Sequence, residues 1–166
     1  MTHFGHACVL VEFDNPTGPD RILLDPGLYS EGFETQRELD AVLVTHSHPD
    51  HIDIERLSPL LTANPDAQLI VDTGTAGRLA ATGLRHRAVA TADEFVVGST
   101  RVAVVATDHA VIHPDVANVV NNGYLIADRV YHPGDALAAP PGPVDVLLLP
   151  AGGPWMKVGD SVDYMR

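Results

Sequence analysis

The most informative segment of this chain is His46-Ser47-His48-Pro49-Asp50-His51, which places four possible metal-binding side chains within six residues. An apolar run over residues 41–45 comes directly before it and has the pattern of a buried strand. Because His46 and His48 are two residues apart, an extended chain turns both imidazoles to the same side. The aspartate and the last histidine of the segment fall at the turn that follows, where they can point to a neighbouring place. This spacing favours two adjacent metal ions over one.

The composition is that of a globular protein and excludes several classes of function. The chain has 166 residues, 45% apolar and 19% charged, which is enough for a single domain over residues 1–166 with a sizeable core. No apolar run approaches the ~20 residues that a membrane-spanning helix needs, so no membrane partner is expected. A single cysteine excludes an internal disulfide, which favours a cytoplasmic protein. The net charge of -12 disfavours nucleic acid as a partner, because phosphates repel an acidic surface.

The rest of the chain alternates segments with the periodicities of strands and helices. We expect strands over residues 6–13, 21–24, 39–44 and 68–71, helices over 52–63 and 75–81, hairpins that pair 95–97 with 101–106 and 124–127 with 130–132, and a last helix from 157 to 166. Pro49 is acceptable in the first turn of a helix, so the first helix is expected to begin close to the histidine segment. An apolar run over residues 144–149, interrupted only by Asp145, predicts a central strand.

Two further candidate ligands lie where expected strands end. His109 follows the strand of the first hairpin, and Asp135 follows the last strand of the second hairpin. A ligand on a loop that is held by a rigid strand is positioned at low entropic cost. Each residue alone is a weak signal. Both gain weight because the histidine segment needs partners from elsewhere in the chain.

Six short segments occur in an order that is typical of one protein family. They are Gly5-His6-Ala7, Leu24-Asp25-Pro26, residues 45–51, His109 after its strand, Tyr131-His132-Pro133-Gly134-Asp135 and Leu149-Pro150-Ala151-Gly152-Gly153. The chain resembles the metallo-β-lactamase superfamily, and within it the branch of small soluble hydrolases that includes the ascorbate-6-phosphate lactonases. The resemblance implies an α/β fold, a four-layer α/β/β/α sandwich, with metals at one edge of the two sheets.

The resemblance also implies a set of metal ligands. In the implied arrangement the first ion is held by His46, His48 and His109, the second by Asp50 and His51, and Asp135 bridges them. Asp50 and Asp135 are therefore the expected catalytic carboxylates. Asp25 is better interpreted as a residue that orients ligands. His6 is expected to lie near the site without a ligand role. Two alternatives stay open for His113, which is either an ordinary loop residue or a residue that contacts the substrate or substitutes at the second site.

The sequence departs from the family pattern near its C-terminus. The last metal ligand of the family is a histidine close to that end, whereas the last histidine here is His132. We therefore expect a C-terminally incomplete domain that lacks the family's last strand and helix. We also expect that the second ion binds more weakly than the first.

Imidazole and carboxylate ligands indicate the chemistry of the site. They suit zinc, as one or two ions, with manganese or iron as alternatives. We expect a metal-dependent hydrolase that uses metal-bound hydroxide to cleave an ester, lactone or phosphodiester bond of a small-molecule substrate. Two alternatives stay open, a mononuclear-iron oxidoreductase that uses only the three-histidine site and a non-catalytic metal-binding form. A homo-oligomer is compatible with the sequence.

Overall fold

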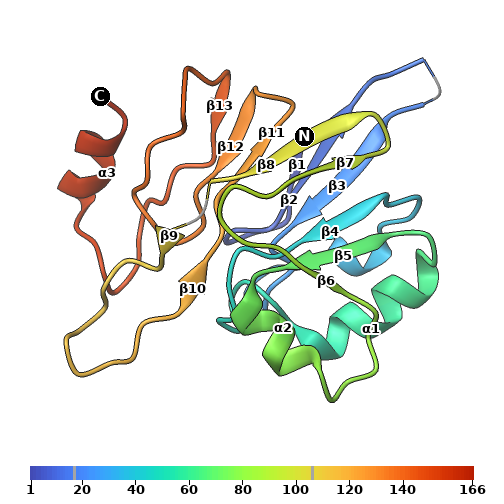
Figure 1. Cartoon of the computed structure of the whole chain (residues 1–166), viewed down its shortest axis with the longest axis horizontal. Coiled ribbons are helices and arrows are strands. Elements are labelled where there is room, and N and C mark those ends of the chain that lie inside the picture. The colour runs from blue at the N-terminus through green and yellow to red at the C-terminus, as the bar shows by residue number, and fades with distance from the viewer. Residues whose placement is uncertain (17, 106) are drawn as a thin grey trace.

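Two β-sheets lie face to face in the computed structural model, which describes residues 1–16, 18–105 and 107–166 (Figure 1). The first sheet has the order β1-β2-β3-β4-β5-β6. Its strands are β1 (Thr2–His3), β2 (Val9–Phe13), β3 (Asp20–Leu24), β4 (Ala41–Leu43), β5 (Gln68–Val71) and β6 (Arg87–Ala88). The second sheet has the order β13-β12-β11-β8-β7. Its strands are β7 (Glu94–Val97), β8 (Thr100–Val104), β11 (Tyr124–Ile126), β12 (Val130–His132) and β13 (Val146–Leu147).

Helices cover the outer faces of both sheets, which gives the expected four layers. The helices α1 (Ile54–Ala63) and α2 (Thr73–Leu79) pack on the first sheet, and α3 (Val158–Tyr164) lies beyond the second (Figure 1). A 3-10 turn, η1 (Phe33–Thr35), precedes β4, and a separate two-stranded pair joins β9 (Thr107–Asp108) to β10 (Val120–Asn121). Among the described residues, no helix has both the length and the apolar character to span a membrane.

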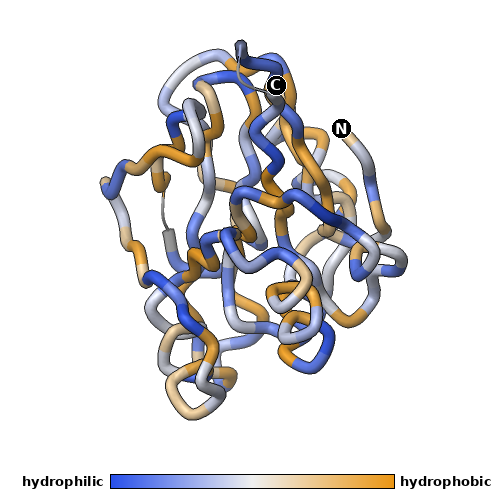
Figure 2. Tube along the Cα trace, turned by 90° about the vertical axis from the view of Figure 1, so that its right-hand side faces the viewer, coloured by the Kyte–Doolittle hydropathy of each residue, from blue (hydrophilic) through white to orange (hydrophobic). Residues whose placement is uncertain are grey.

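The inner strands of the first sheet, β2 to β5, contribute buried residues to both of its faces, which explains their mostly apolar sequences. In β3, Ile22 and Leu24 pack into the core between the two sheets, while Leu23 packs into the core beneath the helices. Val42 of β4 likewise faces the helices. Short hydrophobic and hydrophilic segments alternate along the whole trace (Figure 2). The strands β2 to β5 are therefore held by two cores at once, whereas β1 and β6 at the edges are exposed.

The first helix begins later than the sequence predicts. Asp53 is its N-cap, and its carboxylate accepts hydrogen bonds from the backbone N–H groups of Glu55 at 3.1 Å and Arg56 at 3.2 Å. The helix expected over residues 52–63 thus begins two residues later, at Ile54, and Pro49 lies outside it. Residues 48–51 form a separate turn instead, which leaves the histidine segment free of helical geometry.

The expected central strand over residues 144–149 is also wrong. Only β13 forms there, and it pairs with β12 alone at the edge of the second sheet. An apolar run indicates that the residues of a strand are buried. It does not indicate whether the strand has a neighbour along one edge or along both, so it cannot distinguish an edge strand from a central one. The strand expected over 6–13 begins at Val9, since Gly5 and His6 adopt positive φ angles of 92° and 48° in a turn. Ala106, at the end of the strand expected over 101–106, lies outside the described residues.

A buried carboxylate links the two sheets at the end remote from the histidines. Asp20 of β3 accepts hydrogen bonds from the backbone N–H and hydroxyl of Ser99 at 3.0 and 2.9 Å, and from the hydroxyl of Thr100 at 2.7 Å. Burial alone would raise the pKa of Asp20, but the bonds from Thr100 and Ser99 bring that pKa below its usual range. The ionised form is therefore the one that stabilises the fold.

Replacing Asp20 with Ala should lower the free energy of unfolding by about 2 kcal/mol at pH 7, because hydrogen bonds to a charged group are lost. The difference from wild type should shrink as the pH falls through the depressed pKa of Asp20, since protonation removes the same stabilisation. Urea denaturation at several pH values measures both effects. The exposed Asp66→Ala variant is the control, and an equal loss in both variants would contradict the role of Asp20.

Candidate metal centre

Side chains of both sheets meet at one edge of the molecule. Residues 46–51 form the turn between β4 and α1, His109 directly follows β9, and Asp135 comes soon after β12. An isolated β-bridge joins His46 to Asn121 of β10. The small β9–β10 pair therefore holds His109 beside the turn. All these side chains sit on loops that are anchored by strands.

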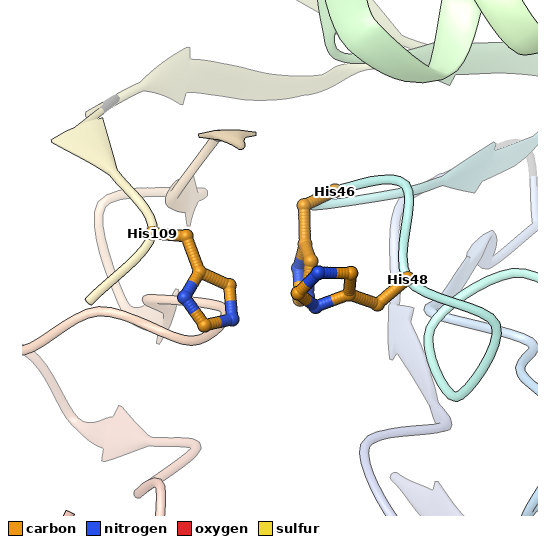
Figure 3. Close-up of side chains that lie close together, drawn as sticks. All are labelled: His46, His48 and His109. Carbon is orange, nitrogen blue, oxygen red and sulfur yellow. The ribbon is translucent and has the colours of Figure 1, made fainter. Parts of the chain in front are cut away.

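Three histidines predicted for the first ion lie together. Their candidate ligand atoms are within 4.8 Å of one another, and the rings of His46, His48 and His109 point into a common space (Figure 3). Nε2 of His46 lies 3.1 Å from Nδ1 of His48. Nδ1 of His109 donates to the carbonyl of Ala110 at 2.6 Å, which leaves Nε2 facing the cluster. Burial and the neighbouring His51 lower the pKa of His46 to about 2, so its imidazole is neutral, as a metal ligand must be.

Asp135 lies between this trio and the turn. Its Oδ1 is 3.3 Å from Nε2 of His51, and its Oδ2 is 3.3 Å from Nε2 of His109. Neither contact has hydrogen-bond geometry, so both nitrogens are buried without a hydrogen-bond partner among the described residues. Buried polar atoms of folded proteins are normally satisfied. A metal ion on each side of Asp135 would satisfy them, so the donor set fits divalent ions.

Charges around His51 also favour a cation at this place. Burial lowers the pKa of His51, but Asp25 and Asp135 raise it more, to about 10. Burial raises the pKa of Asp135, but the neighbouring His109 and His51 hold it well below its usual range. The carboxylates thus favour a positive charge at His51, which either a proton or a metal ion supplies.

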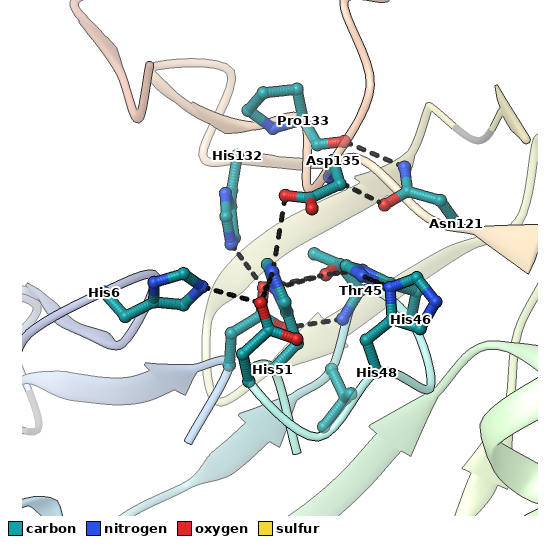
Figure 4. A network of polar contacts seen from close by, with 12 residues as sticks. His6, Thr45, His46, His48, His51, Asn121, His132, Pro133 and Asp135 are labelled. Carbon is teal, nitrogen blue, oxygen red and sulfur yellow. Dashed lines mark hydrogen bonds and ion pairs between the residues drawn. The ribbon is translucent and has the colours of Figure 1, made fainter. Parts of the chain in front are cut away.

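Asp25 is fully buried and contacts several residues of the cluster. Its carboxylate accepts from the backbone N–H and the hydroxyl of Thr45, both at 2.7 Å, and lies 2.7 Å from Nδ1 of His51 and from Nε2 of His132 (Figure 4). Burial opposes its ionisation, but His51 and His132 hold the pKa of Asp25 well below its usual range. Asp25 fixes the ring of His51 so that Nε2 faces Asp135, which matches the orienting role expected from the sequence.

Of the two histidines expected near the site, His6 lies beside the turn residues, whereas His113 lies apart from the cluster. Nε2 of His6 lies 3.0 Å from Oδ2 of Asp50, which is itself 3.9 Å from Nε2 of His51 (Figure 4). His6, Asp50 and His51 form a second group whose candidate ligand atoms are all within 4.8 Å. His113 belongs to none of these groups. Its side chain is 61% exposed, and its Nδ1 lies 3.7 Å from a carboxylate oxygen of Asp115.

Sequence reasoning assigned no role at the site to three residues that the structure places there. Thr45 and His132 bind the carboxylate of Asp25, and the indole N–H of Trp155 donates to Oδ2 of Asp135 at 3.0 Å. Thr45 and His132 both lie inside segments that carry the family resemblance. Trp155 is the single tryptophan of the chain and follows a Gly-Gly pair. These sequence features could have singled out the three residues as candidates for the site. They do not predict which side chains the three residues contact.

Comparisons with known sequences identify the family. The beta-lactamase superfamily domain matches residues 1–166. Protein Rv0786c of Mycobacterium tuberculosis is 48% identical and covers 100% of this chain and 77% of its own length. UPF0173 protein PF0020 of Pyrococcus furiosus is 35% identical over 90% of this chain and 68% of its own length. UPF0173 metal-dependent hydrolase MJ1163 of Methanocaldococcus jannaschii is 25% identical over 92% of this chain and 71% of its own length. The chain belongs to the beta-lactamase superfamily and, within it, to the UPF0173 family of metal-dependent hydrolases.

Solved structures show the same fold at low sequence identity. A crystal structure from Parabacteroides distasonis has a TM-score of 0.73 at 20% identity and covers 98% of this chain and 74% of that one. CmlA, a diiron β-hydroxylase from Streptomyces venezuelae, has a TM-score of 0.65 at 23% identity. The match covers 89% of this chain and 33% of the CmlA chain. These similarities support the four-layer architecture, independently of any chemistry.

Replacing Asp25 with Asn should weaken metal binding by about 10–100-fold, because residues that orient metal ligands typically contribute that much. Asparagine tolerates the positive φ of 43° at this position, so the backbone should be retained. Competition with a chromogenic chelator measures the affinity.

The matched control is Asp72→Asn, which changes another buried carboxylate, the N-cap of α2. Asparagine is an equally good N-cap, so this variant should bind metal as wild type does. Wild-type affinity in the Asp25 variant would contradict the orienting role.

Proposed function

We propose that this chain hydrolyses an ester or lactone bond of a small neutral molecule and that zinc is the metal it uses. The observation that carries the proposal is the position of Asp135, with one oxygen toward His51 and the other toward His109. A pair of divalent ions in such a site lowers the pKa of bound water to about 7 and polarises the bond to be cleaved.

The proposed roles of the protein's own residues follow from their positions. The trio of His46, His48 and His109 would hold the first ion, and the turn residues Asp50 and His51 would contribute to the second. Asp135 would keep the two ions apart and orient the proton of the attacking water. The indole N–H of Trp155 donates to Oδ2 of Asp135. This hydrogen bond would keep Oδ2 toward His109 and Oδ1 toward His51.

A cavity beside the cluster supports the choice of a neutral substrate. It has a volume of about 430 Å³, which suits a small molecule. His51 and Asp135 line one side, and the apolar residues 147–151 line another, with no lysine or arginine in the lining. In the described lining a phosphodiester would therefore meet no lysine or arginine side chain, and the protein as a whole has a net charge of -12. A larger cavity of about 610 Å³ contains no residue of the metal cluster.

Zinc-loaded protein should hydrolyse neutral aryl esters and lactones with a higher kcat/KM than matched aryl phosphodiesters. Replacing Asp135 with Ala should lower kcat/KM by at least about 100-fold, since a direct ligand contributes no less than an orienting residue. Circular dichroism should show a retained fold, because Asp135 lies on a loop.

The exposed Asp163→Ala variant is the control and should keep wild-type turnover. Faster cleavage of phosphodiesters would overturn the proposed substrate class. Near wild-type turnover of the Asp135 variant on every substrate would overturn the proposed site.

A further inference from the structure

We propose that His6 is a direct ligand of the second metal ion, together with Asp50 and His51. The ion would be a divalent transition metal such as zinc, which imidazole and carboxylate ligands suit. This inference rests on the metal centre of the proposed function, but it does not depend on which bond the protein cleaves. The sequence pattern alone placed His6 only near the site.

Distances between the candidate ligand atoms suit one ion. Two atoms that each lie about 2.0–2.1 Å from a tetrahedral zinc ion are about 3.3 Å apart. In the structure, Oδ2 of Asp50 is 3.0 Å from Nε2 of His6 and 3.9 Å from Nε2 of His51. All three atoms lie within 4.8 Å of one another. The pair of Asp50 and His6 is already close to tetrahedral spacing, whereas His51 would have to move nearer to Asp50 than its present 3.9 Å.

An independent observation is the state of His51. Its side chain is 2% exposed, and its Nε2 has no hydrogen-bond partner among the described residues. Nδ1 is already engaged by Asp25, so Nε2 is the atom that remains for a ligand. That nitrogen points toward Asp50 and Asp135, at 3.9 and 3.3 Å. An ion between these groups and His6 would give the buried nitrogen its partner.

The backbone presents His6 in a fixed orientation. Its φ of 48° lies in the left-handed region, which non-glycine residues adopt rarely and mostly at functional sites. The His6 ring contacts Tyr29 edge-on at 5.6 Å and His51 edge-on at 5.4 Å between centroids. A Cβ at Gly27 would lie 1.8 Å from the carbonyl oxygen of Asp50, so the backbone at Gly27 packs tightly against the turn that carries Asp50. Backbone hydrogen bonds of 2.8 Å, from Leu28 to the carbonyl of Pro49 and from Glu31 to the carbonyl of Phe4, tie this segment to the turns that carry Asp50 and His6.

His113 is the rival for this role, because the sequence made it a candidate to complete the second site. Its side chain is 61% exposed and lies beside Asp115. It belongs neither to the two groups described above nor to the third group whose ligand atoms converge, His46, His51 and Asp135. The side chain of His6, in contrast, is 33% exposed and lines the cavity beside the cluster. His6 would therefore hold the ion and border the substrate.

Calorimetric titration of the metal-free full chain with zinc chloride tests the proposal without any substrate. Wild type should bind two ions. His6→Ala should keep the first site and weaken the second by at least about 10-fold. His6→Asn serves as a second variant, because asparagine tolerates the positive φ and its side chain is too short to reach the ion.

His113→Ala and His86→Ala are matched histidine controls and should bind two ions as wild type does. Binding of a single ion by wild type, or two ions at wild-type affinity in both His6 variants, would overturn the assignment. Loss of the second ion in His113→Ala would transfer the role to that residue. Failure to hydrolyse esters would refute the proposed function and leave these binding results unchanged.

Discussion

The carboxylate of Asp25 is the interaction on which the rest of the centre depends. It is fully buried at the end of β3 and joins the end of β4, the histidine turn and the end of β12. An ionised buried group is costly unless it is fully paired, and here hydrogen bonds from Thr45, His51 and His132 supply that pairing. The same bonds hold both sheets in the register that brings the metal-binding side chains together. Stability and site geometry are therefore coupled through one side chain.

The groups that could hold an ion consist only of histidines and aspartates. Three of the histidines, His46, His48 and His109, converge on one side of Asp135, while His6, Asp50 and His51 lie on the other. Such a cluster gathers negative charge around the buried Nε2 atoms of His51 and His109, which have no hydrogen-bond partner among the described residues. Divalent cations balance that charge and use those nitrogens, which is why the arrangement fits a metal centre better than a hydrogen-bonded polar core.

The four layers and the convergence of the three histidines were implied by the resemblance to the metallo-β-lactamase superfamily, whereas local spacing and strand ends alone made His109 and Asp135 only candidate partners of the histidine segment. The sequence did not predict contacts that depend on how the two sheets pack against each other. His132 meets Asp25 across 107 residues of chain, and nothing in the local pattern indicates that distance. The run over 144–149 was placed centrally because periodicity does not report which edge of a sheet is covered. Pro49 suggested a helix start, but the N-cap at Asp53 decides where the helix begins.

The central claim is that Asp135 separates two ions at the meeting point of the sheets. Anomalous X-ray diffraction from crystals of zinc-loaded protein, recorded on both sides of the zinc absorption edge, tests it most directly. The account predicts two zinc peaks roughly 3.5–4 Å apart, one within bonding distance of His46, His48 and His109 and the other of Asp50 and His51, with Asp135 between them. A single peak in the cluster, or peaks only at surface histidines such as His113, would contradict it.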